Sequence, residues 1–494
     1  MRGRYHMKAI ILVLALLLLL PYHPSALAAR PDDAPEKGSV PACSLVLNPE
    51  TVAESDSYEL ERVDVSPLYI GLLYDREAVY EAEFANANGM GFQIGSFDEQ
   101  RSFHPFFETA VSELLIRIER EWYVMMDELF STKEDAAAVS ERYWGRVIEY
   151  NGDVRVLIGP FKNVEEVEYT IRWYGLAAQP WRESCLAVYD GDGRLLELYA
   201  GADELAIEAI SEAKPHTYFN GEQYDGAFLL RRWDGNRLTV INVVELEDYV
   251  KGVIPYEMSP SWPVEALKAQ AVCARTYAAY NRNAYAEDYG FDLTDDTESQ
   301  VYRGINGADA VTDAAVEATR GQFVRYQGQL CEIYYFASDG GATEDGAHVF
   351  GSDRPYLAGK TDPFEPALDF AVMRWERWRG GEEIAWRLRQ KGYAIDSVAK
   401  IEPVYSELGN VIGMRYYGSN GECVALDHRD SYSLLSLDSG RFTVAAEDDG
   451  FRFTGIGWGH NCGMSQWGAN AMAAIYGYTA DDIIRFYFTG AYIG

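Results

Sequence analysis

The chain has 494 residues, of which 48% are hydrophobic and 14% aromatic, so it can form two or three domains and is not a disordered protein. Its formal net charge of -34 argues against a nucleic-acid partner, because phosphates repel an acidic surface. The same charge disfavours electrostatic docking on anionic lipids.

The N-terminus has the order of regions found in secretory signals. A basic start precedes an apolar run over residues 9–20 and small residues at 26–28. This order predicts a signal peptide over residues 1–29, cleaved after Ala28 or Ala29, and export to the cell exterior or cell wall. The alternative is an uncleaved anchor that retains the protein at the membrane, although roughly 20 apolar residues are needed to span a bilayer.

The cysteines are scattered and form no Cys-x-x-Cys pair, so the sequence indicates neither a disulfide scaffold nor a metal or redox site. An even number in an exported chain permits up to three disulfides, whose pairing the sequence leaves open. The six are Cys43, Cys185, Cys273, Cys331, Cys423 and Cys462.

The N-terminal half is expected to hold a linker and a smaller α/β region. Residues 30–65 form the linker, because their first part is rich in Pro, Asp and Glu. The α/β region covers residues 66–213. It begins with a buried strand at 68–74, and helical spacing of apolar residues predicts a helix at 106–138.

A strand at residues 153–161 leads through Gly159-Pro160-Phe161 into an acidic amphipathic helix at 163–174. This unit resembles the peptidoglycan-binding SPOR module, in which a similar turn joins such a strand to such a helix. The resemblance implies a wall-binding role. The alternative is an ordinary α/β unit without a ligand.

A second domain is expected over residues 214–494, where closely spaced strands begin. Asp234-Gly235-Asn236 lies between two apolar runs and predicts a hairpin. A long helix follows Pro263, which suits a first helical turn, and its stripe of small apolar residues indicates close packing. The predicted fold class is α+β, with a β-rich core, this helix and a substrate cleft.

Glu257 is the first candidate for chemistry. It lies among Tyr256, Met258 and Trp262, just before the long helix. Burial against such side chains raises the pKa of a carboxyl group and makes it a general acid. A nearby helix N-terminus would lower that pKa by favouring the carboxylate. From the residues alone, a capping or salt-bridged glutamate is the alternative.

Lys268 and Arg275 are two helical turns apart and share a face of the long helix. They could place positive charge near an oxyanion or an anionic sugar substituent, or form a solvated edge. His460 and Ser465 lie in a glycine-dense segment that does not match a phosphate loop. A serine-hydrolase triad with Asp339 would lack the Gly-x-Ser-x-Gly elbow.

Several sequence blocks follow one another between residues 217 and 494, and together they closely resemble the SpoIID/LytB domain of the stage II sporulation protein D family. The blocks are Leu246-Glu247-Asp248-Tyr249-Val250-Lys251-Gly252-Val253, Glu257-Met258, Ser261-Trp262-Pro263 with residues 265–277, Gln300-Val301-Tyr302-Arg303-Gly304, Gly340-Gly341 with Thr343-Glu344, and Gly459-His460 with residues 463–466.

The resemblance implies an activity. Catalytic members of the family are lytic transglycosylases that cut the glycan strands of peptidoglycan, and the glutamate of the Glu-Met pair is their acid/base. Here that residue is Glu257. As a carboxylic acid it would protonate the glycosidic oxygen. As a carboxylate it would then take the proton of the sugar's 6-hydroxyl, which closes a 1,6-anhydro ring without a second carboxylate.

The resemblance also implies that Lys268 and Arg275 line the cleft. Five further residues match family positions and are expected to bind substrate, without individual chemical roles: Gln300, Tyr302, His460, Ser465 and Gln466.

Some family members hold zinc through a Cys, His, Cys set before the Gln-Val-Tyr block and a His or Cys near the Gly-Gly. This chain has Thr294, Glu298 and Ser299 in the loop, and Ala337 precedes Ser338 near the glycines. Without thiolate or imidazole ligands a tetrahedral zinc site is not expected. We therefore expect no metal and no cofactor.

The sequence thus predicts an exported lytic transglycosylase of peptidoglycan, acting in sporulation or cell-wall remodelling. The N-terminal region would position it on the wall or on partners such as a cell-wall amidase or sporulation membrane proteins. The alternative is a non-catalytic binding protein, since the LytB branch of the family is described as enhancing a wall amidase.

Overall fold

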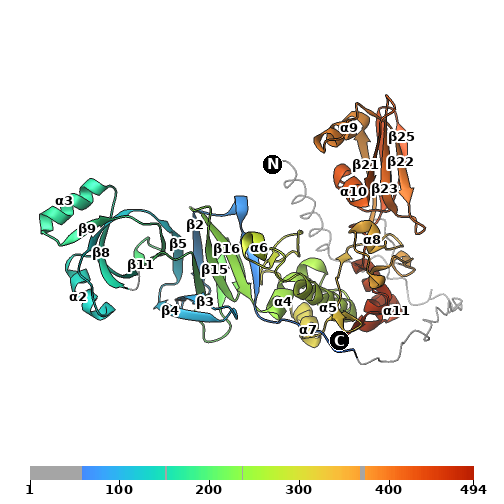
Figure 1. Cartoon of the computed structure of the whole chain (residues 1–494). Helices are drawn as coiled ribbons and strands as arrows, with labels where there is room; N and C mark the ends of the chain where they lie inside the picture. The colour runs from blue at the N-terminus through green and yellow to red at the C-terminus, as the bar shows by residue number, and fades with distance from the viewer. Residues whose placement is uncertain (1–57, 151–152, 236, 368–372) are drawn as a thin grey trace, which may run out of the picture. The chain divides into compact units, whose positions relative to one another are not determined.

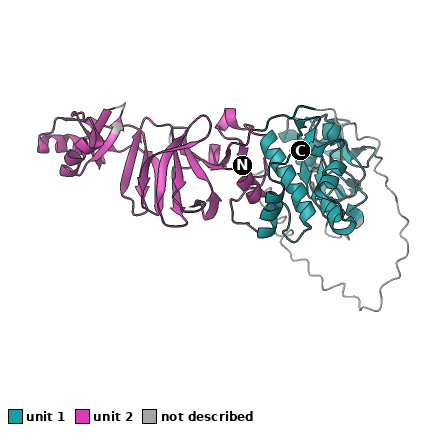
Figure 2. Ribbon diagram, turned by 90° about the horizontal axis from the view of Figure 1, so that it is seen from below, with its two compact units in different colours: residues 1–63, 254–280, 309–494 teal, residues 64–253, 281–308 magenta. Residues whose placement is uncertain are grey.

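The computed structural model describes residues 58–150, 153–235, 237–367 and 373–494 (Figure 1). The predicted signal peptide, Cys43 and most of the predicted linker lie outside these ranges. Figure 2 shows two compact units: unit 2 holds residues 64–253 and 281–308, and unit 1 holds residues 254–280 and 309–494 together with residues up to 63.

Unit 2 is built mainly from antiparallel strands in three sheets. Their strand orders are β17-β1-β16-β15-β12-β3-β4, β11-β10-β5-β2-β13-β14 and β7-β8-β6-β9. The strands are β1 (Leu68–Leu73), β2 (Glu81–Asn86), β3 (Phe92–Phe97), β4 (Phe103–Thr109), β5 (Glu113–Glu119), β6 (Trp122–Met126), β7 (Arg146–Tyr150), β8 (Asp153–Phe161), β9 (Ala178–Trp181), β10 (Cys185–Asp190), β11 (Leu195–Ala200), β12 (Glu204–Ala209), β13 (His216–Phe219), β14 (Glu222–Asp225), β15 (Ala227–Trp233), β16 (Arg237–Val244) and β17 (Leu293–Thr294).

The predicted hairpin is confirmed as β15 and β16, which pair antiparallel over their whole length. Asp234 and Gly235 in the turn have positive φ values of 50° and 68°. Glycine adopts this left-handed conformation at no steric cost, and aspartate does so more readily than most residues. The turn residues therefore fix the point at which the chain reverses.

The predicted helix at residues 106–138 is wrong. The segment forms β4, β5 and β6, and a helix begins only at α2 (Lys133–Arg142). In β5, Leu114 and Ile116 are buried on one face of the sheet. This alternation with a period of two matches a half-buried strand, so the helical spacing of other apolar residues in the segment was coincidental.

The predicted strand and helix around Gly159-Pro160-Phe161 are confirmed as β8 and α3 (Val164–Tyr174). The Asn163 side chain caps the start of α3, and Gly175 ends it in a left-handed conformation. Helices α2 and α3 cover one face of the four-stranded sheet (Figure 1). The other face packs against residues of β10 and β11.

The predicted domain boundary at residue 214 lies inside unit 2. Strand β12 precedes this point and β15 follows it, yet the two pair in one sheet. The first strand of the chain, β1, pairs with β16, and β13 pairs with β2. The N-terminal region therefore shares its sheets with the first strands of the predicted C-terminal domain.

Unit 1 surrounds α5 with other helices and short strands. Helix α5 packs against α7, α11 and α12, which its small side chains allow. The helices outside the N-terminal region, among the described residues, are α4 (Leu246–Glu257, whose residues up to 253 are in unit 2), α5 (Val264–Tyr280), α6 (Ala286–Tyr289, in unit 2), α7 (Ala310–Ala318), α8 (Gly346–Val349), the short 3-10 helices η4 (Pro355–Leu357) and η5 (Glu365–Ala367), α9 (Gly381–Gln390), α10 (His428–Leu435), α11 (Gln466–Tyr476) and α12 (Ala480–Tyr487).

The strands of unit 1 form three three-stranded sheets, β21-β26-β25, β22-β23-β24 and β19-β18-β28, and one two-stranded sheet, β20-β27. The first two of these sheets share a hydrophobic core with α9 and α10. Their bounds are β18 (Val324–Tyr326), β19 (Gln329–Leu330), β20 (Tyr335–Phe336), β21 (Arg374–Gly380), β22 (Val398–Tyr405), β23 (Val411–Gly418), β24 (Cys423–Asp427), β25 (Phe442–Glu447), β26 (Gly450–Ile456), β27 (Met464–Ser465) and β28 (Tyr492–Ile493).

The mixed α/β character expected from the sequence is confirmed. The disulfides that the sequence permitted do not form among the described cysteines, which are free thiols: Cys185, Cys273, Cys331, Cys423 and Cys462. Within the described ranges, no helix has both the length and the apolar character to cross a membrane.

Asp292 holds unit 2 together beside β17, and its loss should destabilise that unit. Its fully buried carboxylate accepts hydrogen bonds from Tyr69 N at 2.9 Å and Asn283 N at 3.2 Å, and pairs with Arg101. We expect Asp292→Ala to lower the free energy of unfolding by about 3 kcal/mol, because it strands a half-buried guanidinium.

Urea unfolding of the full chain measures this change, with the exposed Asp192→Ala as the matched control. An equal effect of the two substitutions would contradict the assignment.

Candidate active site

Glu257 is the last residue of α4, and α5 begins only at Val264. The sequence left open whether burial would raise its pKa more than a nearby helix N-terminus would lower it. The structure instead places Glu257 at a helix C-terminus, where the partial negative charge of the last carbonyl groups disfavours a carboxylate. The local backbone therefore acts in the same direction as burial.

Two side chains hold the Glu257 carboxyl group. Gln466 Nε2 donates to Oε2 at 2.8 Å, and Tyr335 Oη donates to Oε1 at 3.5 Å. Both partners are uncharged, and neither is a backbone amide of α5. Among the described residues, Glu257 is therefore neither the salt-bridged glutamate nor the helix cap that the sequence left open.

Burial raises the pKa of Glu257 from 4.5 to about 7, while the hydrogen bonds from Gln466 and Tyr335 act in the opposite direction. Part of the side chain remains exposed. A carboxyl group with this pKa populates both protonation states near neutral pH, which general acid–base catalysis requires. Glu257 can therefore give up a proton and take one back.

A pair of short parallel strands supplies both partners of Glu257. Tyr335 lies in β20, which pairs with β27, and Gln466 follows β27 directly as the first residue of α11. Gly463 lets the two segments approach, because a Cβ at this position would lie 2.2 Å from the carbonyl oxygen of Tyr334. The glycine-dense segment thus serves close packing of backbone on backbone.

His460 supports Tyr335. Cys462 N donates to His460 Nδ1 at 3.2 Å, so Nε2 carries the proton and donates to the carbonyl oxygen of Tyr335 at 3.1 Å. Burial lowers the pKa of His460 to about 4. The imidazole is therefore neutral at pH 7, and its hydrogen bonds fix the backbone at Tyr335 and Cys462.

Ser465 is fully buried and caps α11, since its Oγ accepts from Gly468 N at 3.1 Å. The same hydroxyl donates to Glu365 Oε2 at 2.7 Å. Ser465 therefore fixes the start of α11. The substrate-binding role predicted for it stays a prediction, and these contacts do not support the triad with His460 and Asp339.

The oxygens of Asp339, Asp362 and Glu365 lie within 4.8 Å of one another, and all three residues are buried. Such an all-oxygen set suits a hard cation such as calcium rather than zinc. Ser338, Ser465 and the backbone amides of Asp339 and Gly340 already occupy the Glu365 oxygens. Burial and the two neighbouring carboxylates raise the pKa of Asp339, so a proton there relieves the repulsion.

Arg275, which was predicted to line the cleft, lies in the interior of unit 1. The side chain is fully buried, and its guanidinium donates to the carbonyl oxygens of Val316 at 3.2 Å and Gln322 at 3.3 Å. It ties α5 to the end of α7 and the turn that follows. Lys268 is partly exposed and pairs with Glu265 at 2.8 Å.

Gln300 and Tyr302 belong to unit 2, where both are buried. Tyr249 Oη donates to Gln300 Oε1 at 3.2 Å, and Tyr302 Oη donates to Asn242 Oδ1 at 2.8 Å. These contacts give both residues a structural role inside unit 2. The structure therefore does not support their predicted substrate contacts.

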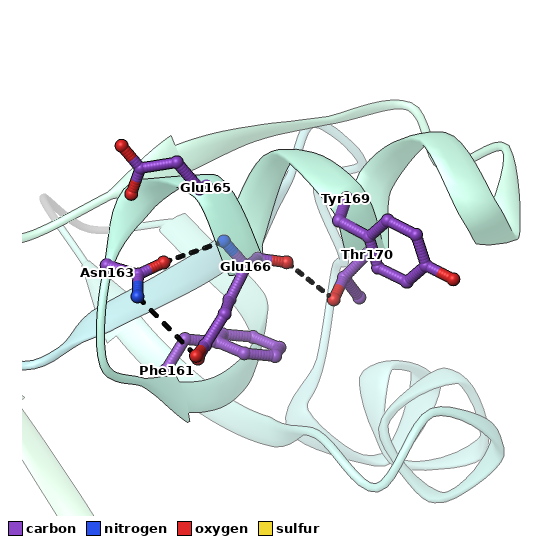
Figure 3. A pocket seen from close by; sticks show the side chains of 6 residues that line it. All are labelled: Phe161, Asn163, Glu165, Glu166, Tyr169 and Thr170. Atoms are coloured by element: carbon purple, nitrogen blue, oxygen red, sulfur yellow. Dashed lines mark hydrogen bonds between the residues drawn. The ribbon is translucent and has the colours of Figure 1, made fainter.

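A shallow pocket of about 530 Å³ lies at the start of α3 in unit 2 (Figure 3). Asn163 Oδ1 accepts from Glu166 N at 2.9 Å, and Thr170 Oγ1 donates to the carbonyl oxygen of Glu166 at 2.9 Å. Figure 3 shows that these polar groups are engaged in capping and bracing the helix. A wall-binding role for this region stays a prediction.

The sequence analysis missed Tyr335, because a tyrosine in a short strand carries no local signal. Its position just before the Ser338-Asp339-Gly340-Gly341 turn is the one feature that could have marked it. Trp467 was missed as well. Its ring lies 4.6 Å from that of Trp262, centroid to centroid, and both residues are partly exposed. Trp467 directly follows Gln466 in the sequence, and Trp262 lies between α4, which Glu257 ends, and α5.

Comparison with known proteins gives one family. A sequence profile described as stage II sporulation protein (SpoIID) matches residues 234–326, which include Glu257. The stage II sporulation protein D of Bacillus subtilis (strain 168) is 31% identical over 268 residues, or 51% of this chain and 74% of that protein. An uncharacterized protein of Brachyspira hyodysenteriae is 35% identical over 284 residues, or 57% of this chain and 75% of that protein.

A further relative is the amidase enhancer of Bacillus subtilis (strain 168). It is 30% identical over 288 residues, which cover 49% of this chain. The match spans only 39% of the length of that protein.

Replacement of Arg275 should reduce stability rather than ligand binding. We expect Arg275→Met to lower the free energy of unfolding by about 3 kcal/mol, because the buried guanidinium hydrogen bonds are lost. Thermal unfolding measures this. The affinity of the remaining folded protein for glycan should be unchanged, and a selective loss of affinity at unchanged stability would restore the predicted binding role.

Glu257→Gln should stabilise the protein in a pH-dependent way. The folded pKa of about 7 lies above the unfolded value near 4.5. The free-energy cost of burying the ionised Glu257 carboxylate is therefore absent below pH 4.5. It grows as pH rises from 4.5 to 7 and reaches its full value above pH 7. We expect the substitution to stabilise the protein by about 2 kcal/mol more at pH 8 than at pH 5. Thermal unfolding at both pH values is the measurement, and a gain independent of pH would contradict the raised pKa.

Proposed function

Because the chain belongs to the stage II sporulation protein D family, we propose that it is a peptidoglycan lytic transglycosylase with Glu257 as its single acid/base. The observation that carries the proposal is the state of Glu257, a partly exposed carboxyl group with a pKa of about 7 and two uncharged hydrogen-bond partners. The names of the sporulation and amidase-enhancer relatives fit a role at the cell wall.

The proposed reaction begins with protonated Glu257. Its proton passes to the glycosidic oxygen as the C1–O bond breaks, and the bonding electron pair leaves with that oxygen. Positive charge develops on C1 and the ring oxygen. The 6-hydroxyl of the same sugar then attacks C1, its proton returns to Glu257, and a 1,6-anhydro ring closes.

One carboxyl group suffices for this sequence because the nucleophile is part of the substrate. A hydrolase needs a second carboxylate to activate water or to form a glycosyl intermediate. The two groups that hold Glu257 are an amide and a phenol, and neither can take that part.

Two further groups of unit 1 fit a glycan. The partly exposed rings of Trp262 and Trp467 offer apolar faces on which a sugar ring can pack. The ammonium group of Lys268 is partly exposed and can reach an anionic substituent if it leaves Glu265.

The same proposal includes export of the protein to the cell wall and a substrate cleft at Glu257. It also includes the role of the N-terminal region in positioning the protein on the wall.

The second candidate is a non-catalytic protein that enhances a cell-wall amidase. The similarity to the amidase enhancer of Bacillus subtilis favours it. It differs from the first candidate in requiring no chemistry from Glu257.

We expect the wild type to release products with 1,6-anhydro ends from purified glycan strands, and Glu257→Gln to be at least about 100-fold slower, because a general acid is lost. The rate of the wild type should fall as pH rises through about 7, since Glu257 must start protonated. Mass spectrometry of timed digests measures both effects.

The matched control is the exposed carboxylate variant Glu382→Gln. Equal cleavage by wild type and Glu257→Gln would contradict the assigned acid. Absence of cleavage by either protein, combined with stimulation of an added amidase, would support the enhancer.

A further inference from the structure

Three carboxyl groups that the proposed reaction does not use lie together inside unit 1. Asp339, Asp362 and Glu365 have exposed fractions of 0%, 1% and 2%, and one oxygen of each lies within 4.8 Å of the other two. Among the described residues, no lysine or arginine side chain bonds to any of the three. Buried like charges without a counter-charge are costly, so the cluster requires positive charge from another source.

One oxygen of this cluster lacks a hydrogen-bond donor. Both oxygens of Glu365 accept from serine hydroxyls and backbone amides. Asp362 Oδ1 accepts from backbone amides, and its Oδ2 accepts from Tyr487 Oη at 2.6 Å. Asp339 Oδ1 accepts from Gly341 N at 2.7 Å. Asp339 Oδ2 is buried and accepts from no donor in the part of the chain that the structure describes, although its carboxyl group faces the two other carboxyl groups.

We propose that Asp339, Asp362 and Glu365 bind a calcium ion, with Asp339 Oδ2 as one of its ligands. Calcium binds oxygen at roughly 2.3–2.6 Å, so two of its ligands lie at most about 5 Å apart. The spacing of 4.8 Å meets this limit. Magnesium retains several waters, whereas calcium accepts a shell made entirely of protein oxygens, which suits a buried site.

Neutral oxygens beside the carboxyl groups can complete the shell. The hydroxyl groups of Ser338 and Ser465 contact Glu365, and that of Tyr487 contacts Asp362. A hydroxyl oxygen has two lone pairs, so it can bind a cation while its proton is donated elsewhere. The site therefore offers enough oxygens for the six to eight ligands, roughly, that calcium takes.

A proton on Asp339, shared with Glu365, is the alternative source of positive charge. It removes one negative charge from the cluster, whereas a divalent cation offsets two and contacts all three carboxyl groups at once. The cation thus compensates the cluster more fully. Because a proton and calcium compete for Asp339 Oδ2, calcium affinity should fall at acidic pH.

The calcium ion ties together segments that carry the proposed active site. Asp339 lies shortly after β20, which holds Tyr335. Glu365 bonds to Ser465, which caps α11, and Gln466 is the first residue of that helix. The ion is therefore structural, and its removal should lower the stability of unit 1.

Calorimetric titration of the full-length protein with calcium tests the proposal after dialysis against a chelator. Sodium chloride at about 0.15 M and excess magnesium suppress diffuse binding to a chain with a net charge of -34. We expect a single strong site with a dissociation constant of about 10 µM or lower. Calcium at about 1 mM should then raise the melting temperature by about 5 °C.

Asp339→Asn keeps the size of the side chain and removes the charge of the ligand. We expect it to weaken calcium binding by about 100-fold and to abolish the thermal shift, because a carboxylate ligand is lost. Asp362→Asn has the same expected effect and serves if the first variant does not fold. The matched control is the exposed Asp353→Asn, which should bind calcium as the wild type does.

Elemental analysis of the untreated protein covers an ion that the chelator fails to remove. The wild type should then contain calcium and Asp339→Asn should not. Absence of calcium from the wild type in both measurements would overturn the proposal, as would equal binding by Asp339→Asn. A wild type that takes no calcium but is stabilised by Asp339→Asn would assign the site to the proton instead. None of these measurements uses glycan, so they are independent of the proposed function.

Discussion

The placement of one carboxyl group between two uncharged donors, at the end of a helix, is the constraint on which the proposed chemistry depends. A lysine or arginine bonded to Glu257 would hold it as a carboxylate and prevent acid catalysis. Burial at the C-terminus of α4 instead raises its pKa to about 7, and Gln466 and Tyr335 orient it without fixing its charge. Near pH 7 the neutral and ionised forms of Glu257 are thus nearly equal in free energy.

The rest of unit 1 keeps this arrangement rigid. The β20–β27 pair sets Tyr335 opposite Met464, two residues before Gln466, and Ser465 links the start of α11 to the buried Glu365. Glu365 is itself held by four hydrogen-bond donors. Buried hydrogen-bond networks make the surrounding structure rigid. Glu365 therefore contributes to the site by fixing Ser465 and the start of α11.

The sequence predicted the pieces of the fold with clear local signals and missed those set by pairing partners. The hairpin of β15 and β16 and the α3 unit carried turn residues and caps, whereas β4 to β6 resembled a helix because their apolar spacing was ambiguous. The predicted boundary at residue 214 falls inside unit 2, since long-range pairing of β1 with β16 leaves no local mark in the sequence.

Residue types likewise identified Glu257 but could not give its neighbours. Arg275 and Tyr302 matched family positions, yet the structure buries both, because a matched position does not distinguish a residue that binds substrate from one that supports the fold. Gln466 was found without its contact to Glu257, and Tyr335 was not found.

The central claim is that Glu257 acts without an activated water, and digestion of glycan strands in water enriched in oxygen-18 tests it most directly. We expect the new sugar ends to be 1,6-anhydro rings that lack the mass of one water and contain no oxygen-18. New reducing ends that carry oxygen-18 would show that water is the nucleophile, and would contradict the single-carboxyl mechanism.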